Sequence, residues 1–123
     1  MILVDTSVWV DHFRHGDDTL AALLQSAEVL CHPWVTGELA LAQLSQREEI
    51  LALLRGLPQA TLATEAEVLA AIDVHRLHGR GIGYVDVQLL ASTLLMAEAR
   101  LWTRDKRLAS AASELGRAAT RLD

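Results

Sequence analysis

The sequence predicts an α/β fold in which a mostly parallel central sheet of four or five short strands carries helices on both faces. Three observations favour this class. Short apolar runs alternate along the 123 residues with longer segments whose apolar side chains recur at helical spacing. Strands that alternate with helices form parallel sheets. Hydrophobic residues make up 51% of the chain, so residues 1–123 are expected to form one globular domain.

The first strand is predicted over residues 2–4, an apolar run that stops at Asp5. Thr6 and Ser7 are residue types that begin helices, and the apolar spacing continues as a helix to Phe13. Asp5 therefore lies at the carboxyl end of a strand, where ligands bind in open parallel sheets. Its carboxylate serves either as a metal or phosphate ligand or as a helix cap.

Further elements follow in the same alternation. Helical spacing predicts a helix ending near Ala27, residues 29–31 form a second strand, and Pro33 suits the first turn of a helix that carries Glu38. A capping-box pattern at residues 45–48 predicts the start of another helix, which ends at Gly56.

Residues 60–62 predict a weak third strand, and a second capping box, Thr64 with Glu67, starts a helix that runs toward His78. The glycine-rich loop 79–83 leads into a helix opened by Asp86.

The last predicted strand covers residues 100–103 and ends within two residues of Asp105. A final helix carries Leu108 to Leu115, and residues 118–122 could add an edge strand. Asp5 and Asp105 thus follow separate strands, while Glu38 and Asp86 lie early in helices that start at the same edge of the sheet. We expect these acids to converge.

Composition narrows the functional classes. The net charge of −5 at pH 7 argues against a protein held to nucleic acid by bulk positive charge. Clustered acids that hold a metal would contribute to this balance, so an RNA or DNA substrate stays open. Cys31 is the single cysteine and is expected to be a buried hydrophobe in a reducing, cytoplasmic setting. No apolar run approaches membrane-spanning length, and no membrane association is expected.

Four segments now carry a resemblance to a known family: Val4-Asp5-Thr6-Ser7, Gly37-Glu38-Leu39, Gly83-Tyr84-Val85-Asp86 and Trp102-Thr103-Arg104-Asp105. In order and spacing they resemble the acidic quartet of PIN-domain ribonucleases, and the whole chain resembles the VapC toxins of type II toxin–antitoxin pairs. The resemblance implies a PIN-like three-layer fold. It also implies hydrolysis of RNA by a Mg²⁺-dependent endoribonuclease, with Mn²⁺ as a substitute.

The resemblance also assigns roles. Asp5, Glu38, Asp86 and Asp105 would be the catalytic and metal-binding carboxylates, and hard divalent cations do prefer such oxygen ligands. The hydroxyls of Thr6, Ser7 and Thr103 would hold the carboxylates in place. Arg104, Lys106 and Arg107 could contact substrate phosphates or simply form a solvated helix start. Many relatives carry a further acid after the last one, whereas Lys106 and Arg107 follow Asp105 here.

The implied partners are the RNA substrate, a small VapB-like antitoxin and a second copy of the chain in a homodimer. An antitoxin arginine or lysine could replace the charge of the metal among the carboxylates. Candidate residues for an antitoxin groove are Trp9, Trp34, Leu39 and Leu41, although core packing explains them equally well. Trp9 and Trp102 are expected in the core or at a dimer interface, and Trp34 nearer the surface.

Two other classes compete. The first is an aspartate-based phosphoryl-transfer enzyme, but Ser7 stands where haloacid-type phosphatases have a second aspartate, and no acidic pair ends the first strand as in receiver domains. The second is a non-catalytic PIN-like binding module, against which the intact acidic quartet argues.

Overall fold

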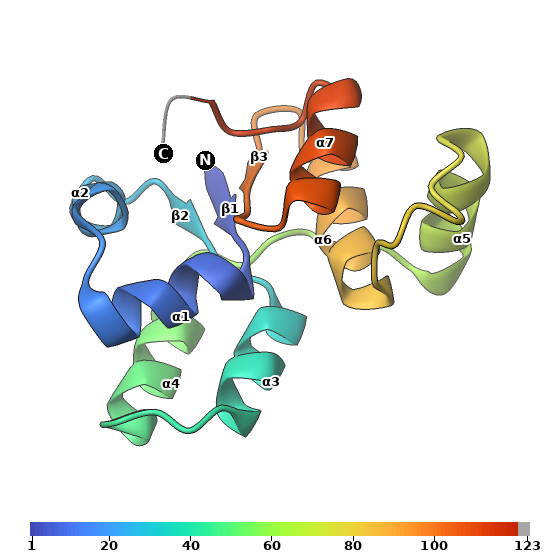
Figure 1. Cartoon of the computed structure of the whole chain (residues 1–123). Coiled ribbons are helices and arrows are strands. Elements are labelled where there is room, and N and C mark those ends of the chain that lie inside the picture. The colour runs from blue at the N-terminus through green and yellow to red at the C-terminus, as the bar shows by residue number, and fades with distance from the viewer. Residues whose placement is uncertain (121–123) are drawn as a thin grey trace.

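Three parallel strands form the centre of the computed structural model, which describes residues 1–120. The strands are β1 (Ile2–Val4), β2 (Val29–Leu30) and β3 (Arg100–Trp102), and they lie in the order β2-β1-β3 (Figure 1). Val4 pairs with Trp102 in the register of β1 and β3. Because the strands are parallel, the carboxyl ends of β1 and β3 meet at one edge of the sheet.

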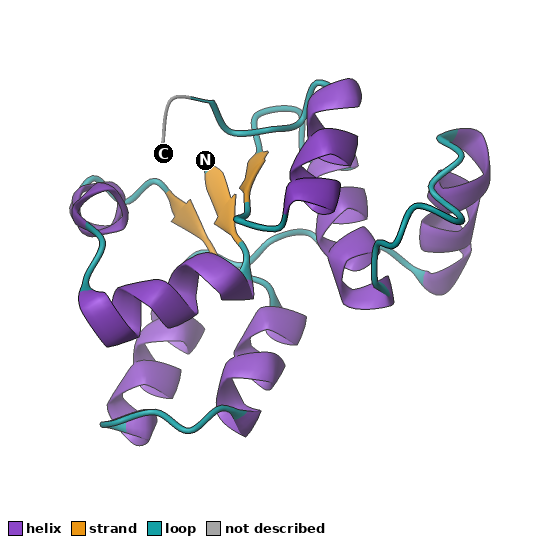
Figure 2. Cartoon of the chain, viewed as in Figure 1, coloured by secondary structure: helices purple, strands orange, loops and turns teal. Residues whose placement is uncertain are grey.

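Seven helices surround this sheet in the described residues (Figure 2). In Figure 1, α1, α3 and α4 group on one side of the strands, α6 and α7 on the other, and α5 lies beyond α6. Their bounds are α1 (Thr6–His15), α2 (Asp18–Gln25), α3 (Pro33–Leu41), α4 (Arg47–Gly56), α5 (Glu65–Val74), α6 (Tyr84–Leu94) and α7 (Lys106–Glu114).

The core joins the strands to the helices that cover them. Trp9 of α1 is fully buried and stacks on Phe13, with ring centroids 5.5 Å apart, and Trp102 of β3 is buried as well. These two rings are core residues, as expected. Cys31 is buried and free, which confirms its expected role as a small hydrophobe.

Fewer strands form than the four or five expected. Within the described residues, the predicted strands 60–62 and 118–122 are replaced by single bridges, Cys31 with Gln59 and Leu101 with Ala118. Residues 121 and 122 of the second segment lie outside the described part. The reason is length: β2 has only two residues and β3 only three, so each offers a neighbouring segment few backbone partners with which to extend a ladder.

The two predicted capping boxes have opposite outcomes. Thr64 and Glu67 form the expected reciprocal box at the start of α5. The box at Ser45 is wrong, because α4 begins at Arg47 after Gln46, whose φ of 56° is left-handed and whose side chain caps nothing. The Arg47 guanidinium donates instead to the Ala40 carbonyl at 2.9–3.0 Å.

The helix predicted to run toward His78 ends earlier. α5 stops at Val74, and Arg76 adopts a left-handed φ of 53°. The Leu77 amide then donates back to the Ile72 carbonyl at 3.0 Å, which returns the buried Leu77 side chain to the core. Among residues 1–120, no helix is long and apolar enough to cross a membrane.

The contrast between the two boxes predicts different stability effects. Thr64→Ala removes the side-chain cap of α5 and should lower the free energy of unfolding by about 1 kcal/mol. Ser45→Ala should change it by less than about 0.5 kcal/mol, since Ser45 starts no helix. Urea unfolding of both variants measures the difference, and equal losses would mean that Ser45 also caps a helix.

Candidate active site

Asp5 sits directly after β1, where its amide continues the sheet by donating to the Trp102 carbonyl at 2.9 Å. It occupies the position before the first residue of α1, yet its carboxylate caps no amide of that helix. Instead Oδ2 accepts hydrogen bonds from the hydroxyls of Ser7 and Thr103, each at 2.7 Å. The side chain is 5% exposed. Of the two roles open for Asp5, the structure therefore removes the helix cap.

Hydroxyl groups tie the end of β1 to the end of β3. Thr103 Oγ1 donates to Asp5 and accepts from the Asp105 amide at 3.1 Å. Ser7 Oγ likewise donates to Asp5 and accepts from the Arg104 amide at 3.1 Å. The two hydroxyls thus position Asp5 relative to the turn that carries Asp105. Thr103 and Asp5 are 98 residues apart in the sequence.

The Asp105 side chain caps the helix that follows it. Its Oδ1 accepts from the amides of Arg107 and Leu108 at 2.9 and 3.0 Å and so caps α7. The residue is exposed. The cap fixes the carboxylate at the start of α7, at the same sheet edge as Asp5.

Glu38 reaches the site from α3. The Thr6 hydroxyl, in the first turn of α1, donates to Glu38 Oε1 at 2.6 Å. Glu38 is exposed and Thr6 is half-buried. The hydrogen bond therefore links α3 to the start of α1, one residue after Asp5.

Asp86 lies in the first turn of α6 and is half-buried, with Oδ2 accepting from the Gly83 amide at 3.3 Å. Burial raises the pKa of its carboxyl group, and the negative charge of Asp5 raises it further. The Gly83 amide lowers this pKa, whereas the charges of Asp105 and Glu38 add smaller increases. The charges of the other three predicted acids thus all act on the Asp86 carboxyl group.

These carboxylates do not form a ready coordination cage. In residues 1–120, no three His, Cys, Asp or Glu side chains are grouped as they would be around a metal ion. Mg²⁺ keeps several of its waters in proteins and needs only one or two direct carboxylates. A loosely spaced set of acids that repel each other therefore fits a hydrated Mg²⁺ ion better than it fits a metal with a full protein shell.

Comparison with known proteins identifies the family. Residues 2–114 match the PIN domain family. The chain belongs to the PIN-domain family. It is 52% identical over 116 residues to Ribonuclease VapC32 of Mycobacterium tuberculosis, in both strain CDC 1551 / Oshkosh and strain ATCC 25618 / H37Rv, and the match covers 94% of each chain. This identity places the PIN domain among the VapC ribonucleases.

Solved structures support the fold. The crystal structure of FitAcB from Neisseria gonorrhoeae is similar with a TM-score of 0.63 and 22% identity, over 92% of this chain and 94% of that one. FitAB bound to an IR36 DNA fragment is similar with a TM-score of 0.60 and 23% identity, over 92% and 91% of the two chains. At such identities the likeness concerns the fold.

The basic residues beside Asp105 in this PIN domain differ in their surroundings. Arg104 makes ion pairs with Asp11 (3.1 Å) and Asp17 (2.6 Å), and its guanidinium lies 6.0 Å from the centre of the Trp102 ring. It is therefore already engaged within the chain. Sequence reasoning missed these pairs, because the partners come from α1 and from the residue that caps α2.

Arg107 and Lys106 are exposed. The Arg107 guanidinium packs on the backbone of Gly81, where a Cβ would lie 2.5 Å from its Nη1. Gly81 also has a φ of 74°, which favours glycine. Arg107 therefore lies over the loop that leads into α6 and Asp86.

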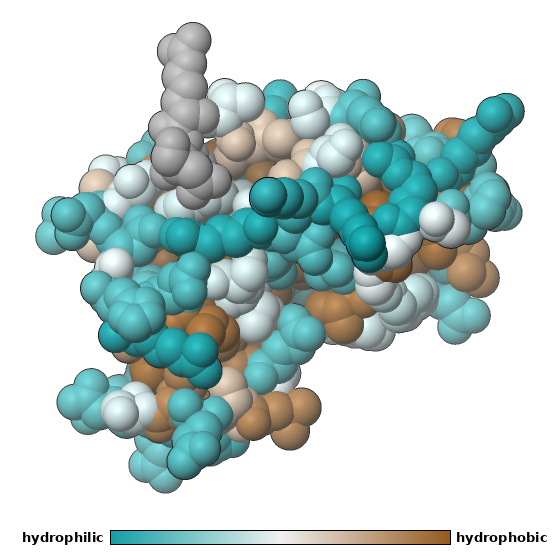
Figure 3. All heavy atoms as spheres, in the orientation of Figure 1, coloured by the Kyte–Doolittle hydropathy of each residue, from teal (hydrophilic) through white to brown (hydrophobic). Residues whose placement is uncertain are grey.

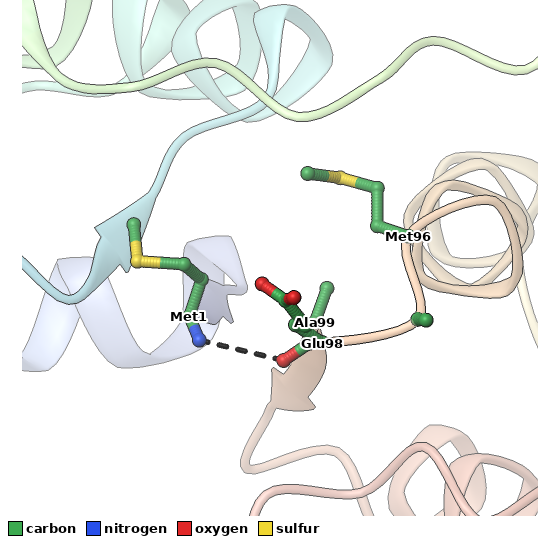
Figure 4. Close-up of a pocket in the computed structure, with 5 residues that line it drawn as sticks. Met1, Met96, Glu98 and Ala99 are labelled. Carbon is green, nitrogen blue, oxygen red and sulfur yellow. Dashed lines mark hydrogen bonds between the residues drawn. The ribbon is translucent and has the colours of Figure 1, made fainter.

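A pocket of about 240 Å³ lies elsewhere in the PIN domain (Figure 4). It is lined by Met1, Met96 and residues 97–99, and the amino-terminal nitrogen donates to the Glu98 carbonyl at 3.4 Å. These residues precede β1 and β3, so the pocket lies at the amino ends of the strands, opposite the acids.

The proposed antitoxin groove needs correction. Trp9 and Leu39 are fully buried core residues and cannot line an open groove. Trp34 and Leu41 are 41% and 90% exposed, which confirms the surface position expected for Trp34. The face shown in Figure 3 is largely hydrophilic, with hydrophobic side chains in separate patches.

Asp86→Asn should stabilise the metal-free protein at neutral pH. The fold raises the pKa of Asp86 above its value in the unfolded chain. The protonated Asp86 carboxyl therefore contributes to the free energy of unfolding at acidic pH, and this contribution is lost as the pH rises through the folded pKa. The asparagine carries no charge and can still accept from Gly83. We expect a gain of up to about 1 kcal/mol at neutral pH in chelator, which disappears below the ordinary carboxyl pKa.

Thermal or urea unfolding across pH measures this gain. Asp73→Asn, at an exposed position of α5, is the matched control and should show little change at any pH. A loss of stability in Asp86→Asn at neutral pH would show that the carboxylate stabilises the fold.

Thr103→Val tests the hydroxyl link between Asp5 and Asp105. The valine keeps the shape of the side chain but leaves a buried carboxylate without one of its donors, which should cost about 1–3 kcal/mol. Ser92→Ala is the control, because the Ser92 hydroxyl is buried without a hydrogen-bond partner in the described structure. Similar losses in both variants would contradict the proposed importance of the link.

Proposed function

We propose that this protein is a Mg²⁺-dependent endoribonuclease that acts as the toxin of a type II toxin–antitoxin pair, with residues 1–123 as one nuclease domain. The observation that carries the proposal is the hydrogen bonding of the acids at the sheet edge, where Ser7 and Thr103 donate to Asp5 and Thr6 donates to Glu38. The charges of Asp5, Asp105 and Glu38 also raise the pKa of Asp86. Membership of the PIN-domain family and 52% identity to a VapC ribonuclease support it.

The four acids have distinct roles in metal binding and hydrolysis. Asp5, Asp86 and Asp105 would hold Mg²⁺ directly or through its waters, and Glu38 would bind the ion or orient the attacking water. When bound, Mg²⁺ supplies a Lewis acid for the phosphodiester and offsets the repulsion among the carboxylates. Mn²⁺ has similar ligand preferences and should substitute.

The neighbouring side chains prepare these acids. Ser7 and Thr103 donate to one oxygen of Asp5, and Thr6 donates to Glu38, so both carboxylates keep their orientation before substrate arrives. Lys106 and Arg107, which are exposed beside Asp105, would contact substrate phosphates. Arg104 is less suited to this role because of its ion pairs with Asp11 and Asp17.

The geometry favours hydrolysis over a phosphoryl-aspartate mechanism. Asp5 would be the nucleophile of such a mechanism, but the position two residues later, where haloacid-type phosphatases have a second aspartate, holds Ser7, whose hydroxyl donates to Asp5 Oδ2. A non-catalytic module would have no need for four mutually repelling acids in one place.

Two protein partners complete the proposal, a second copy of the chain and a small VapB-like antitoxin. Crowded carboxylates attract a cation, and an antitoxin arginine or lysine can supply that charge through its N–H donors in place of the metal. Both partners would act in the cytoplasm, where the free thiol of Cys31 stays reduced.

Cleavage of single-stranded RNA by the purified protein should require Mg²⁺ or Mn²⁺ and stop in excess chelator. Asp86→Asn and Asp105→Asn should each lower the rate by about a hundredfold or more, the scale at which loss of a group that stabilises developing charge acts. Asp73→Asn should cleave at the wild-type rate.

Gel analysis of a labelled RNA follows the reaction. Equal cleavage in chelator would contradict the metal-dependent mechanism, and trapping of an acyl phosphate on Asp5 would instead support the phosphoryl-transfer enzyme.

A further inference from the structure

Two large aromatic side chains lie in contact on the surface. Trp34 of α3 is 41% exposed and Tyr84 of α6 is 44% exposed, with ring centroids 5.7 Å apart and the ring planes tilted by 57°. Tyr84 is the only tyrosine of the chain, and the other two tryptophans, Trp9 and Trp102, are buried. Burial of such rings is strongly favourable, so an exposed pair in one place points to a ligand.

The pair does not anchor its helices to the core. On α3 the neighbouring Val35 is fully buried, and on α6 Val87 is 4% exposed. These apolar side chains already attach both helices to the interior. The two rings contact each other between the helices and leave 41% and 44% of their residues exposed to solvent.

The rings lie on the two helices that carry Glu38 and Asp86. Trp34 precedes Glu38 by four residues on α3, which places both side chains on one face of that helix. Tyr84 is the first residue of α6, two residues before Asp86. The pair thus connects the starts of the two helices that contribute Glu38 and Asp86.

The backbone at both rings is held by side chains. The Trp34 amide donates to Nδ1 of the fully buried His32 at 3.0 Å. The Gly83 amide, next to Tyr84, donates to Asp86 at 3.3 Å. Rings on fixed backbone lose little freedom when a planar ligand stacks on them.

The chemistry of RNA indicates which ligand would bind to the exposed pair of rings. With a net charge of −5, the protein gains little from bulk attraction to phosphates, so contacts that do not depend on charge would add to the local phosphate contacts proposed for Lys106 and Arg107. Stacking of unpaired bases on aromatic side chains supplies such contacts and tolerates any base. We propose that Trp34 and Tyr84 form a stacking subsite for a nucleobase that flanks the scissile phosphate of single-stranded RNA, an inference that rests on the proposed ribonuclease function.

Ring substitutions test the subsite in the full-length protein. Trp34→Ala and Tyr84→Ala should each raise KM for a short unstructured RNA by about tenfold, the scale expected for loss of one stacked base, with kcat changed less than twofold. Trp34→Phe and Tyr84→Phe keep a ring and should stay within about threefold of wild type. Val74→Ala, which trims a 72%-exposed side chain of α5, is the matched control and should not change KM.

Tryptophan fluorescence provides a second measurement on the unmodified protein. Because Trp9 and Trp102 are buried, RNA that stacks at the subsite should quench Trp34 and protect it from a soluble quencher. An oligonucleotide of equal length with abasic sites keeps its phosphates but has no bases, and it should do neither. Equal quenching by the abasic oligonucleotide would overturn the proposal.

The remaining outcomes separate this inference from the proposed function. Normal Mg²⁺-dependent cleavage with an unchanged KM in both alanine variants overturns the stacking subsite and leaves the ribonuclease intact. Base-dependent quenching without cleavage supports the subsite and contradicts the ribonuclease. A change of oligomeric state in the alanine variants by sedimentation, or loss of antitoxin binding with unchanged KM, would assign the rings to a protein interface and overturn the proposal.

Discussion

The candidate site depends on the hydroxyl of Thr103, which joins the ends of two strands that are far apart in sequence. Parallel pairing brings Asp5 and Thr103 to the same sheet edge, but pairing alone does not orient a carboxylate. Thr103 donates to Asp5 Oδ2 at 2.7 Å and accepts from the Asp105 amide at 3.1 Å. The buried Thr103 hydroxyl therefore fixes both the orientation of the Asp5 carboxylate and the turn before α7.

The other three acids are held by different local hydrogen bonds, and these affect the stability of the fold in different ways. Asp105 caps α7, so its charge stabilises the helix that carries it. Glu38 accepts from Thr6 at the start of α1. Asp86 gains only one weaker backbone hydrogen bond and bears the burial and the repulsion of the others. A bound cation near Asp86 would offset this repulsion.

The surroundings divide the site into sides with different chemistry. Arg104 is drawn away by Asp11 and Asp17 and ties α1 and the start of α2 to the turn after β3. Arg107 packs over Gly81 on the side of α6. The aromatic pair Trp34 and Tyr84 stands between α3 and α6. A nucleic acid strand at the acids would meet cationic groups from α7 and flat apolar rings from α3 and α6.

Much of this could be predicted from residue patterns, because those patterns are local. The apolar run 2–4 before Asp5 and the capping box of Thr64 and Glu67 express preferences of adjacent residues, and the structure contains both. The alternation of elements also predicted that Asp5, Glu38, Asp86 and Asp105 meet at one edge. The Ser45 box failed although its pattern was equally good, since Arg47 found a partner in the Ala40 carbonyl and the chain entered α4 through a left-handed Gln46.

Only the tertiary structure decided the properties that depend on residues far apart in the sequence. No local pattern distinguishes Asp5, which caps nothing, from Asp105, which caps α7, because the difference lies in the two hydroxyls that reach Asp5. The ion pairs of Arg104 with Asp11 and Asp17 likewise join residues that are far apart in the sequence. The sequence by itself determined which residues stand at strand ends and helix starts. Packing decided their partners, their exposure and the charge that each one feels, because these depend on groups that the chain brings together only when it folds.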